Sequence, residues 1–130
     1  MDMQITLDAK LQAVSKSTQQ LEIHLQQLAL ELRTTIVLAV QELLVNIVQH
    51  AYDGKQGTIE FAMQQAKDSI NIQVRDYAPK AFEKPDQLKA PDPLDLPEHG
   101  MGLYIIYQTF DEVAYQRLAD GNHWRLVKAL

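Results

Sequence analysis

The order of helical and strand-like segments in this 130-residue chain predicts an α+β sandwich, in which helices cover one face of a mostly antiparallel sheet. Two observations support this fold class. The first half contains two long segments whose apolar residues recur near helical spacing, and the second half contains two pairs of strand-like runs separated by short turns. The length is enough for one domain with its own core, so we expect a single domain over residues 1–130.

The N-terminal half is predicted to hold one short strand and two helices. The strand covers residues 4–7. The first helix covers about residues 10–30, where five apolar residues recur near helical spacing: Leu11, Val14, Leu21, Leu25 and Leu28. The second helix is expected over residues 32–51, because Asp53 and Gly54 follow it with the turn chemistry that ends a helix.

The C-terminal half is predicted to hold two hairpins with one more helix between them. Residues 58–65 and 69–75 form the first hairpin, and in its second strand isoleucine and valine alternate with polar residues. This alternation places one face of the strand on a core. The helix covers residues 101–109, and residues 113–118 and 123–127 form the closing hairpin around an Asp-Gly-Asn turn.

A proline-rich segment lies between the two hairpins. All five prolines of the chain occur from Pro79 to Pro97. Proline interrupts both helices and sheets, so this segment is expected to be a long loop without regular structure. Because long loops in compact domains are usually functional or disordered, it is a candidate part of a binding site.

Three polar side chains recur at four-residue spacing in the second predicted helix, which is otherwise mostly apolar: Glu42, Asn46 and His50. A four-residue step along an α-helix rotates by only about 40° and rises by about 6 Å, so the three form one polar stripe. Apolar residues cover the other side, and the stripe therefore needs a site to face. Each residue also has an ordinary interpretation: a solvated Glu, a locally bonded Asn, and a His that covers the helix end.

The composition is that of an ordinary soluble globular domain, with 46% hydrophobic and 22% charged residues. A formal net charge of -5 without a Lys/Arg cluster argues against nucleic acid as a partner. The chain has no cysteine, and residues 1–4 lack the basic and apolar regions of a secretory signal. No apolar run approaches the roughly 18 residues that span a bilayer, so we expect a cytoplasmic protein without a membrane partner.

Residues 41–52 resemble the N-box of the GHKL ATPase and kinase superfamily, in which the Glu is a general base and the Asn is a magnesium ligand. Two more motifs follow in the family's order: residues 75–82 are similar to its adenine-binding Asp motif, and residues 99–103 to its Gly-x-Gly-Leu phosphate motif. The His-Ala-Tyr end of the first motif and residues 111–113 are most similar to the short anti-sigma-factor serine kinases. The resemblance implies the Bergerat-type fold and an ATP lid at about residues 77–99.

The same resemblance implies roles for the polar stripe. Glu42 would be the catalytic base, Asn46 would bind the nucleotide and coordinate Mg²⁺, and His50 would contact phosphate or the lid. Mg²⁺ takes oxygen ligands and keeps some of its waters, a demand that one amide oxygen and phosphate oxygens satisfy. ATP and Mg²⁺ are thus the implied ligands.

The other two motifs supply the remaining expected nucleotide contacts. Asp76 ends an alternating strand, and its carboxylate would accept a hydrogen bond from the exocyclic amine of adenine, whereas guanine offers a carbonyl. Ala78 stands where the family has a glycine, which is the smallest departure. Gly100, Gly102 and Leu103 precede or begin a helix, where backbone N–H groups without an intrahelical partner can bind phosphate.

By resemblance, the chain is expected to be an ATP- and Mg²⁺-dependent serine/threonine protein kinase. It would phosphorylate an anti-sigma-factor antagonist protein and sequester a sigma factor when that antagonist is modified. The resemblance also makes a homodimer a candidate assembly. Two alternatives stay open: an ATP-sensing interaction module without transfer activity, and an interaction domain whose motifs no longer bind nucleotide.

Overall fold

A computed structural model describes residues 2–82 and 101–130 of the chain. Most of the segment predicted as the lid, together with Gly100, lies outside these residues. The strands are β1 (Asp2–Asp8), β2 (Thr58–Gln65), β3 (Ser69–Asp76), β4 (Glu112–Leu118) and β5 (Gly121–Ala129). They form one five-stranded sheet in the order β1-β2-β3-β5-β4, and every neighbouring pair is antiparallel.

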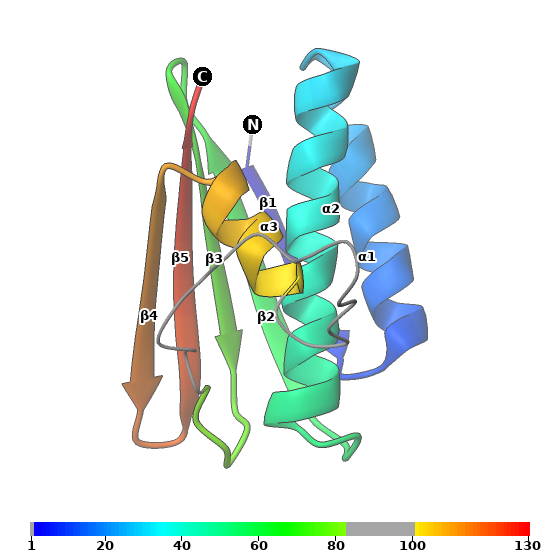
Figure 1. The fold of residues 1–130 in the computed structure, drawn as a ribbon. Coiled ribbons are helices and arrows are strands. Elements are labelled where there is room, and N and C mark those ends of the chain that lie inside the picture. Colours follow the sequence, from blue (N-terminus) through cyan, green and yellow to red (C-terminus); the bar gives the residue numbers. More distant parts are fainter. Residues whose placement is uncertain (1, 83–100) are drawn as a thin grey trace, which may run out of the picture.

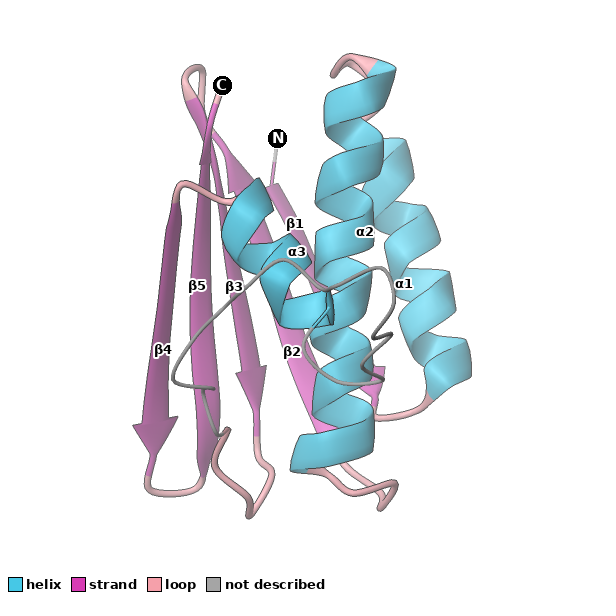
Figure 2. Cartoon of the chain, viewed as in Figure 1, coloured by secondary structure: helices cyan, strands magenta, loops and turns pink. Residues whose placement is uncertain are grey.

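Helices cover one face of this sheet and complete a two-layer arrangement (Figure 1). They are α1 (Leu11–His24), α2 (Leu30–Asn46), the π-helical turn η1 (Ile47–Ala51) and α3 (Met101–Thr109). Helices α1 and α2 lie side by side, and α3 packs against α2 over the middle of the sheet (Figure 2). The predicted α+β sandwich is confirmed. No helix in the described part of the chain is long and apolar enough to cross a membrane.

The core lies between the helices and one face of the sheet. Alternation along each strand sends every second side chain toward the helices, as in β3, where Ile70, Ile72 and Val74 are fully buried. Trp124 and Leu126 continue this buried face on the neighbouring strand β5, because they pair with Val74 and Ile72. The sheet therefore has one apolar face and one polar face, and Asp76 lies on the apolar one.

The first helix is shorter than its apolar spacing predicts. Helix α1 ends at His24, and residues 25–29 form a turn before α2 begins at Leu30. Leu25 is fully buried within this turn, and Leu28 packs against the core from the same turn. The predicted helix to residue 30 is wrong because these leucines are apolar for core packing and do not continue the helix.

The closing hairpin is longer than predicted. Gly121 pairs directly with Leu118, so the turn consists of Ala119 and Asp120. Asn122 was expected in the turn, but it is the second residue of β5 and pairs with Asp76 on β3. This register brings a polar side chain of the last strand to the end of the third strand.

Candidate functional site

Asp76 is a buried carboxylate at the C-terminal end of β3. It is only 1% exposed. Its Oδ1 atom accepts three hydrogen bonds, from the backbone N–H of Ala78 at 3.0 Å, the backbone N–H of Asn122 at 3.2 Å and the side-chain amide of Asn122 at 2.9 Å. Its Oδ2 atom is buried and has no hydrogen-bond partner among the described residues. A buried acceptor without a partner is costly, so this atom is suited to a ligand that donates a hydrogen bond.

Asn122 connects Asp76 to Tyr115 on β4 and, through the Tyr115 hydroxyl, to Phe82. It is 1% exposed, and its side-chain amide also donates to the carbonyl of Lys80 at 3.1 Å. Its Oδ1 accepts a hydrogen bond from the hydroxyl of Tyr115, and that hydroxyl accepts one from the backbone N–H of Phe82 at 2.9 Å. The rings of Phe82 and Trp124 pack edge to face at 4.9 Å between centroids. The orientation of the Asp76 carboxylate is therefore set by residues on β4 and β5.

Arg117 on β4 fastens the segment that follows Asp76. Its guanidinium donates to the carbonyls of Ala78 at 2.9 Å and Pro79 at 3.0 Å. With the bonds to Lys80 and Phe82, the closing hairpin holds residues 78–82, which belong to the described part of the predicted lid.

Ala78 causes no backbone strain where the family has glycine. Among the described residues other than glycine, only Asp53 has a positive φ, so Ala78 adopts a conformation open to any L-residue. The side chain is fully buried in the core, and its N–H bonds to Asp76. The methyl group therefore fits at this position, and the Asp76 turn forms with alanine in place of glycine.

Gly121 allows the closest approach of β5 to the end of β3. A Cβ atom added there would lie 1.9 Å from the carbonyl oxygen of Asp76. On the outer face, Arg75 bonds to the same carbonyl at 3.1 Å and to the carboxylate of Asp120 at 2.6 Å. The hydrogen bond from Arg75 holds the pKa of the Asp120 carboxyl below its ordinary value. The turn after β4 is thus tied to the Asp76 backbone through Arg75.

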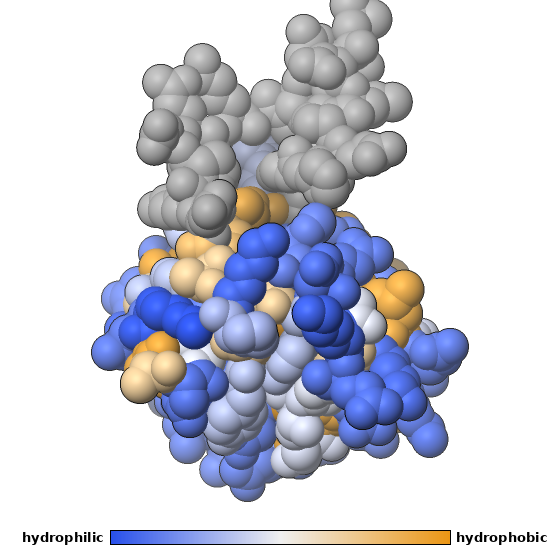
Figure 3. Space-filling view, turned by 90° about the horizontal axis from the view of Figure 1, so that it is seen from below, coloured by the Kyte–Doolittle hydropathy of each residue, from blue (hydrophilic) through white to orange (hydrophobic). Residues whose placement is uncertain are grey.

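The N-box residues occupy the helix layer of the same end of the molecule. Glu42 and Asn46 both lie near the C-terminal end of α2, one turn apart, and both are partly exposed. Neither side chain is hydrogen-bonded or ion-paired to another residue in the described ranges. Figure 1 shows the C-terminal ends of α2 and β3 at one end of the molecule, and Figure 3 views this end, whose surface is mostly hydrophilic.

His50 lies in the π-helical turn η1 and not in the α-helix that carries Glu42 and Asn46. It is an exposed residue of η1, where the backbone N–H of Tyr52 bonds to the carbonyl of Ile47 at 2.9 Å, a five-residue step. A π turn takes more residues than an α turn, so a four-residue step no longer completes it. The α-helix of the stripe prediction therefore holds Glu42 and Asn46, and His50 lies in the π turn that follows.

The residues of the predicted phosphate motif are placed only in part. Gly100 lies outside the described residues, and Gly102 is the second residue of α3. Leu103 is buried in the core and anchors the first turn of that helix.

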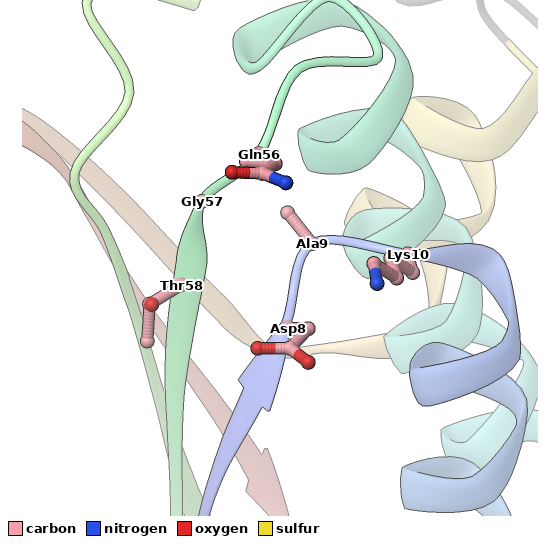
Figure 4. Close-up of a pocket in the computed structure, with 6 residues that line it drawn as sticks. All are labelled: Asp8, Ala9, Lys10, Gln56, Gly57 and Thr58. Carbon is pink, nitrogen blue, oxygen red and sulfur yellow. The ribbon is translucent and has the colours of Figure 1, made fainter.

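Two further features bear on ligand binding. Within the described ranges, no group of three or more His, Cys, Asp or Glu side chains could hold a metal ion. A hollow of about 430 Å³ lies between the end of β1 and the start of β2 (Figure 4), lined by Asp8, Ala9, Lys10, Gln56, Gly57 and Thr58. None of the predicted site residues lines it, so it is separate from the Asp76 carboxylate.

Sequence reasoning did not assign a site role to Asn122, Tyr115 and Arg117, nor to Tyr52, whose hydroxyl accepts a hydrogen bond from the backbone N–H of Tyr77 at 2.8 Å. The first three act through the register of β3, β4 and β5, which the sequence does not specify by itself. Tyr52 carries a local signal, since an aromatic residue directly follows the predicted helix and precedes an Asp-Gly turn.

Comparison with known proteins supports the same relationship. The family described as the histidine kinase-like ATPase domain matches residues 6–128. The serine-protein kinase RsbW of Bacillus cereus is 32% identical over 83 residues, which cover 58% of this chain and 51% of that protein. The RsbW of Bacillus thuringiensis subsp. konkukian matches with the same identity and coverage. The chain spans about half the length of these curated relatives.

Proposed function

This chain belongs to the histidine kinase-like ATPase domain family, and on that premise we propose that it binds ATP with Mg²⁺ and phosphorylates a partner protein. The partner would be an anti-sigma-factor antagonist, modified on a serine or threonine, and the unmodified antagonist would compete with a sigma factor for this chain. The relatives named serine-protein kinase support the reaction class.

The observation that carries the proposal is the state of the Asp76 carboxylate. Its Oδ1 is held by three donors, and its Oδ2 is buried without a partner in the described part of the chain. The exocyclic amine of adenine would donate to Oδ2, whereas the carbonyl of guanine would face it with a second acceptor. The site therefore favours an adenine nucleotide.

The helix side would supply the groups that act on the phosphates. Glu42 would take the proton of the attacking serine or threonine hydroxyl. The oxygen of that hydroxyl would bond to the γ-phosphorus while the bond from this phosphorus to the leaving ADP oxygen breaks. The amide oxygen of Asn46 would hold Mg²⁺, which neutralises phosphate charge when bound. One protein ligand would be enough for Mg²⁺, because the ion keeps several waters and also binds phosphate oxygens. A cluster of carboxylates or histidines, which the described residues do not contain, is therefore not required.

Nucleotide choice is tested by calorimetry with ATP and GTP on the wild type and on Asp76→Asn. Because Oδ1 accepts three hydrogen bonds, the substituted amide nitrogen would take the place of Oδ2 and present a donor to the adenine amine. ATP binding should weaken by about 1–3 kcal/mol, or about 5- to 150-fold, while thermal unfolding changes little. Asp120→Asn makes the same chemical change on the exposed outer face and should bind ATP like the wild type. Equal affinities for ATP and GTP would contradict the adenine assignment.

The metal role is tested by ATP titrations in Mg²⁺ and in EDTA. Asn46→Ala should weaken ATP binding in Mg²⁺ much more than in EDTA, because only the metal-bound complex loses a ligand. Gln49→Ala removes an exposed amide from the same helix end and is the matched control. Equal losses in both buffers would mean that Asn46 is structural. ATP binding without labelled phosphate on any antagonist of the same genome would favour the sensing module over the kinase.

A further inference from the structure

Tyr52 joins three segments of the candidate site. It directly follows η1 and is 4% exposed. Its hydroxyl donates to the carbonyl of Thr58 at 2.5 Å and accepts from the backbone N–H of Tyr77 at 2.8 Å. The Tyr52 hydroxyl thus connects the end of the helix that carries Glu42 and Asn46 to the first residue of β2 and to the backbone of Tyr77, which lies between Asp76 and Ala78.

The local backbone is built to turn Tyr52 toward the sheet. The π turn adds a residue before it, and Asp53 and Gly54 then reverse the chain with φ values of 54° and 74°. Gly57 makes room for the ring, because a Cβ atom added there would lie 2.1 Å from Tyr52 Cε1. A helix-surface tyrosine needs none of these features.

We propose that Tyr52 is a positioning residue that keeps the helix carrying Glu42 and Asn46 in register with the Asp76 turn; this role rests on the proposed function. A nucleotide bound by its base at Asp76 and through its phosphates at the helix engages two elements of different layers. Preorganising their separation lowers the cost of engaging both at once. The base side keeps its own supports, because Asn122 and Arg117 hold Asp76 and Ala78 from β5 and β4.

The positioning role predicts that Tyr52→Phe lowers the affinity for Mg-ATP but not the affinity for adenosine. In Tyr52→Phe, the affinity for Mg-ATP should fall about 5- to 30-fold, the range expected when one or two hydrogen bonds are lost. The affinity for adenosine, which needs only the base side, should stay within about twofold of the wild type. A purely structural tyrosine would lower both affinities together as the protein loses stability.

Hydrogen exchange tests the contact without any nucleotide. The Tyr77 amide should be protected in the wild type and should lose protection in Tyr52→Phe, whereas the Val74 amide inside the β3 ladder should stay protected. Equal protection of Tyr77 in both proteins would overturn the role of the hydroxyl.

Two more variants separate position from chemistry. Tyr77→Phe removes an exposed phenol that bonds to Glu60 on the outer face, so both affinities should remain at wild-type values. Gly57→Ala keeps the Tyr52 hydroxyl but displaces its ring, and it should reproduce the split seen in Tyr52→Phe. Equal losses for Mg-ATP and adenosine in Tyr52→Phe would overturn the positioning role alone. Failure of the wild type to bind Mg-ATP would overturn the proposed function and this role with it.

Discussion

On the sheet side of the site, Asp76 and Asn122 are both 1% exposed and bond to each other, whereas on the helix side Glu42 and Asn46 are partly exposed and bond to no other described side chain. The sheet side is held by bonds from β4, β5, residues 78–82 and Tyr52. The helix side presents its polar groups on the single helix α2. Substitutions on the sheet side that remove a hydrogen bond within the fold should therefore change stability together with binding. Those on the helix side should change ligand chemistry and leave the fold intact.

The largest expected effect is on the helix side. Glu42→Gln keeps the size and the hydrogen-bonding capacity of the side chain but removes the base, so phosphate transfer should fall by about 10²- to 10⁴-fold while Mg-ATP binding persists. Labelled transfer to an antagonist protein and calorimetry on one preparation measure both quantities. Glu31→Gln, near the other end of α2, is the matched control. Transfer at the wild-type rate in Glu42→Gln would remove the base assignment.

The next effect concerns the sheet side and should appear first in stability. Asn122→Ala removes a donor to Asp76 and the acceptor for the Tyr115 hydroxyl, leaving buried polar groups with fewer partners. We expect a loss of about 1–3 kcal/mol in the free energy of unfolding, measured by urea denaturation, together with weaker ATP binding. Gln116→Ala changes an exposed amide on β4 and should unfold at the wild-type midpoint. An unchanged midpoint for Asn122→Ala would contradict the expectation that substitutions on the sheet side lower stability more than those on the helix side.

The smallest effect links the two sides through pH. Burial raises the pKa of the Tyr52 hydroxyl above its ordinary value of 10.0. The folded state therefore holds this proton more tightly than the unfolded state, so the contribution to stability is complete below about pH 10 and is lost as the pH rises further. The difference in unfolding free energy between the wild type and Tyr52→Phe should be constant from pH 8 to about pH 10 and should shrink above it. A constant difference up to pH 11 would contradict the prediction.

Local patterns were sufficient to predict the fold class, one residue on the sheet side of the candidate site and two residues on its helix side. Alternation in residues 69–75 identified a half-buried strand, and Asp76 follows it on the buried face. The four-residue spacing placed Glu42 and Asn46 on one face of α2. These features depend on neighbouring residues only, which is why the sequence shows them.

Features that depend on distant pairing were not predictable in this way. Asn122 was taken for a turn residue because Gly121 is typical of turns, yet Gly121 is required by the carbonyl of Asp76 on another strand. The last predicted turn of the second helix, which holds His50, is the π turn η1, and no spacing rule distinguishes a π turn from an α turn. The turn after α1 was hidden by Leu25, whose burial keeps the apolar period beyond the helix end.

The bond between Asp76 and Asn122 also determines when, during synthesis of the chain, the hydrogen bonds around Asp76 can form. The two residues are 46 positions apart, and Asn122 lies on β5, which follows β1, β2 and β3 in chain order. A nascent chain that has already exposed β1, β2 and β3 has an Asp76 carboxylate without its strand partner. Because sheet pairing of this kind forms only when the distant strand arrives, the Asp76 carboxylate gains its hydrogen bonds to Asn122 only after β5 has been synthesised.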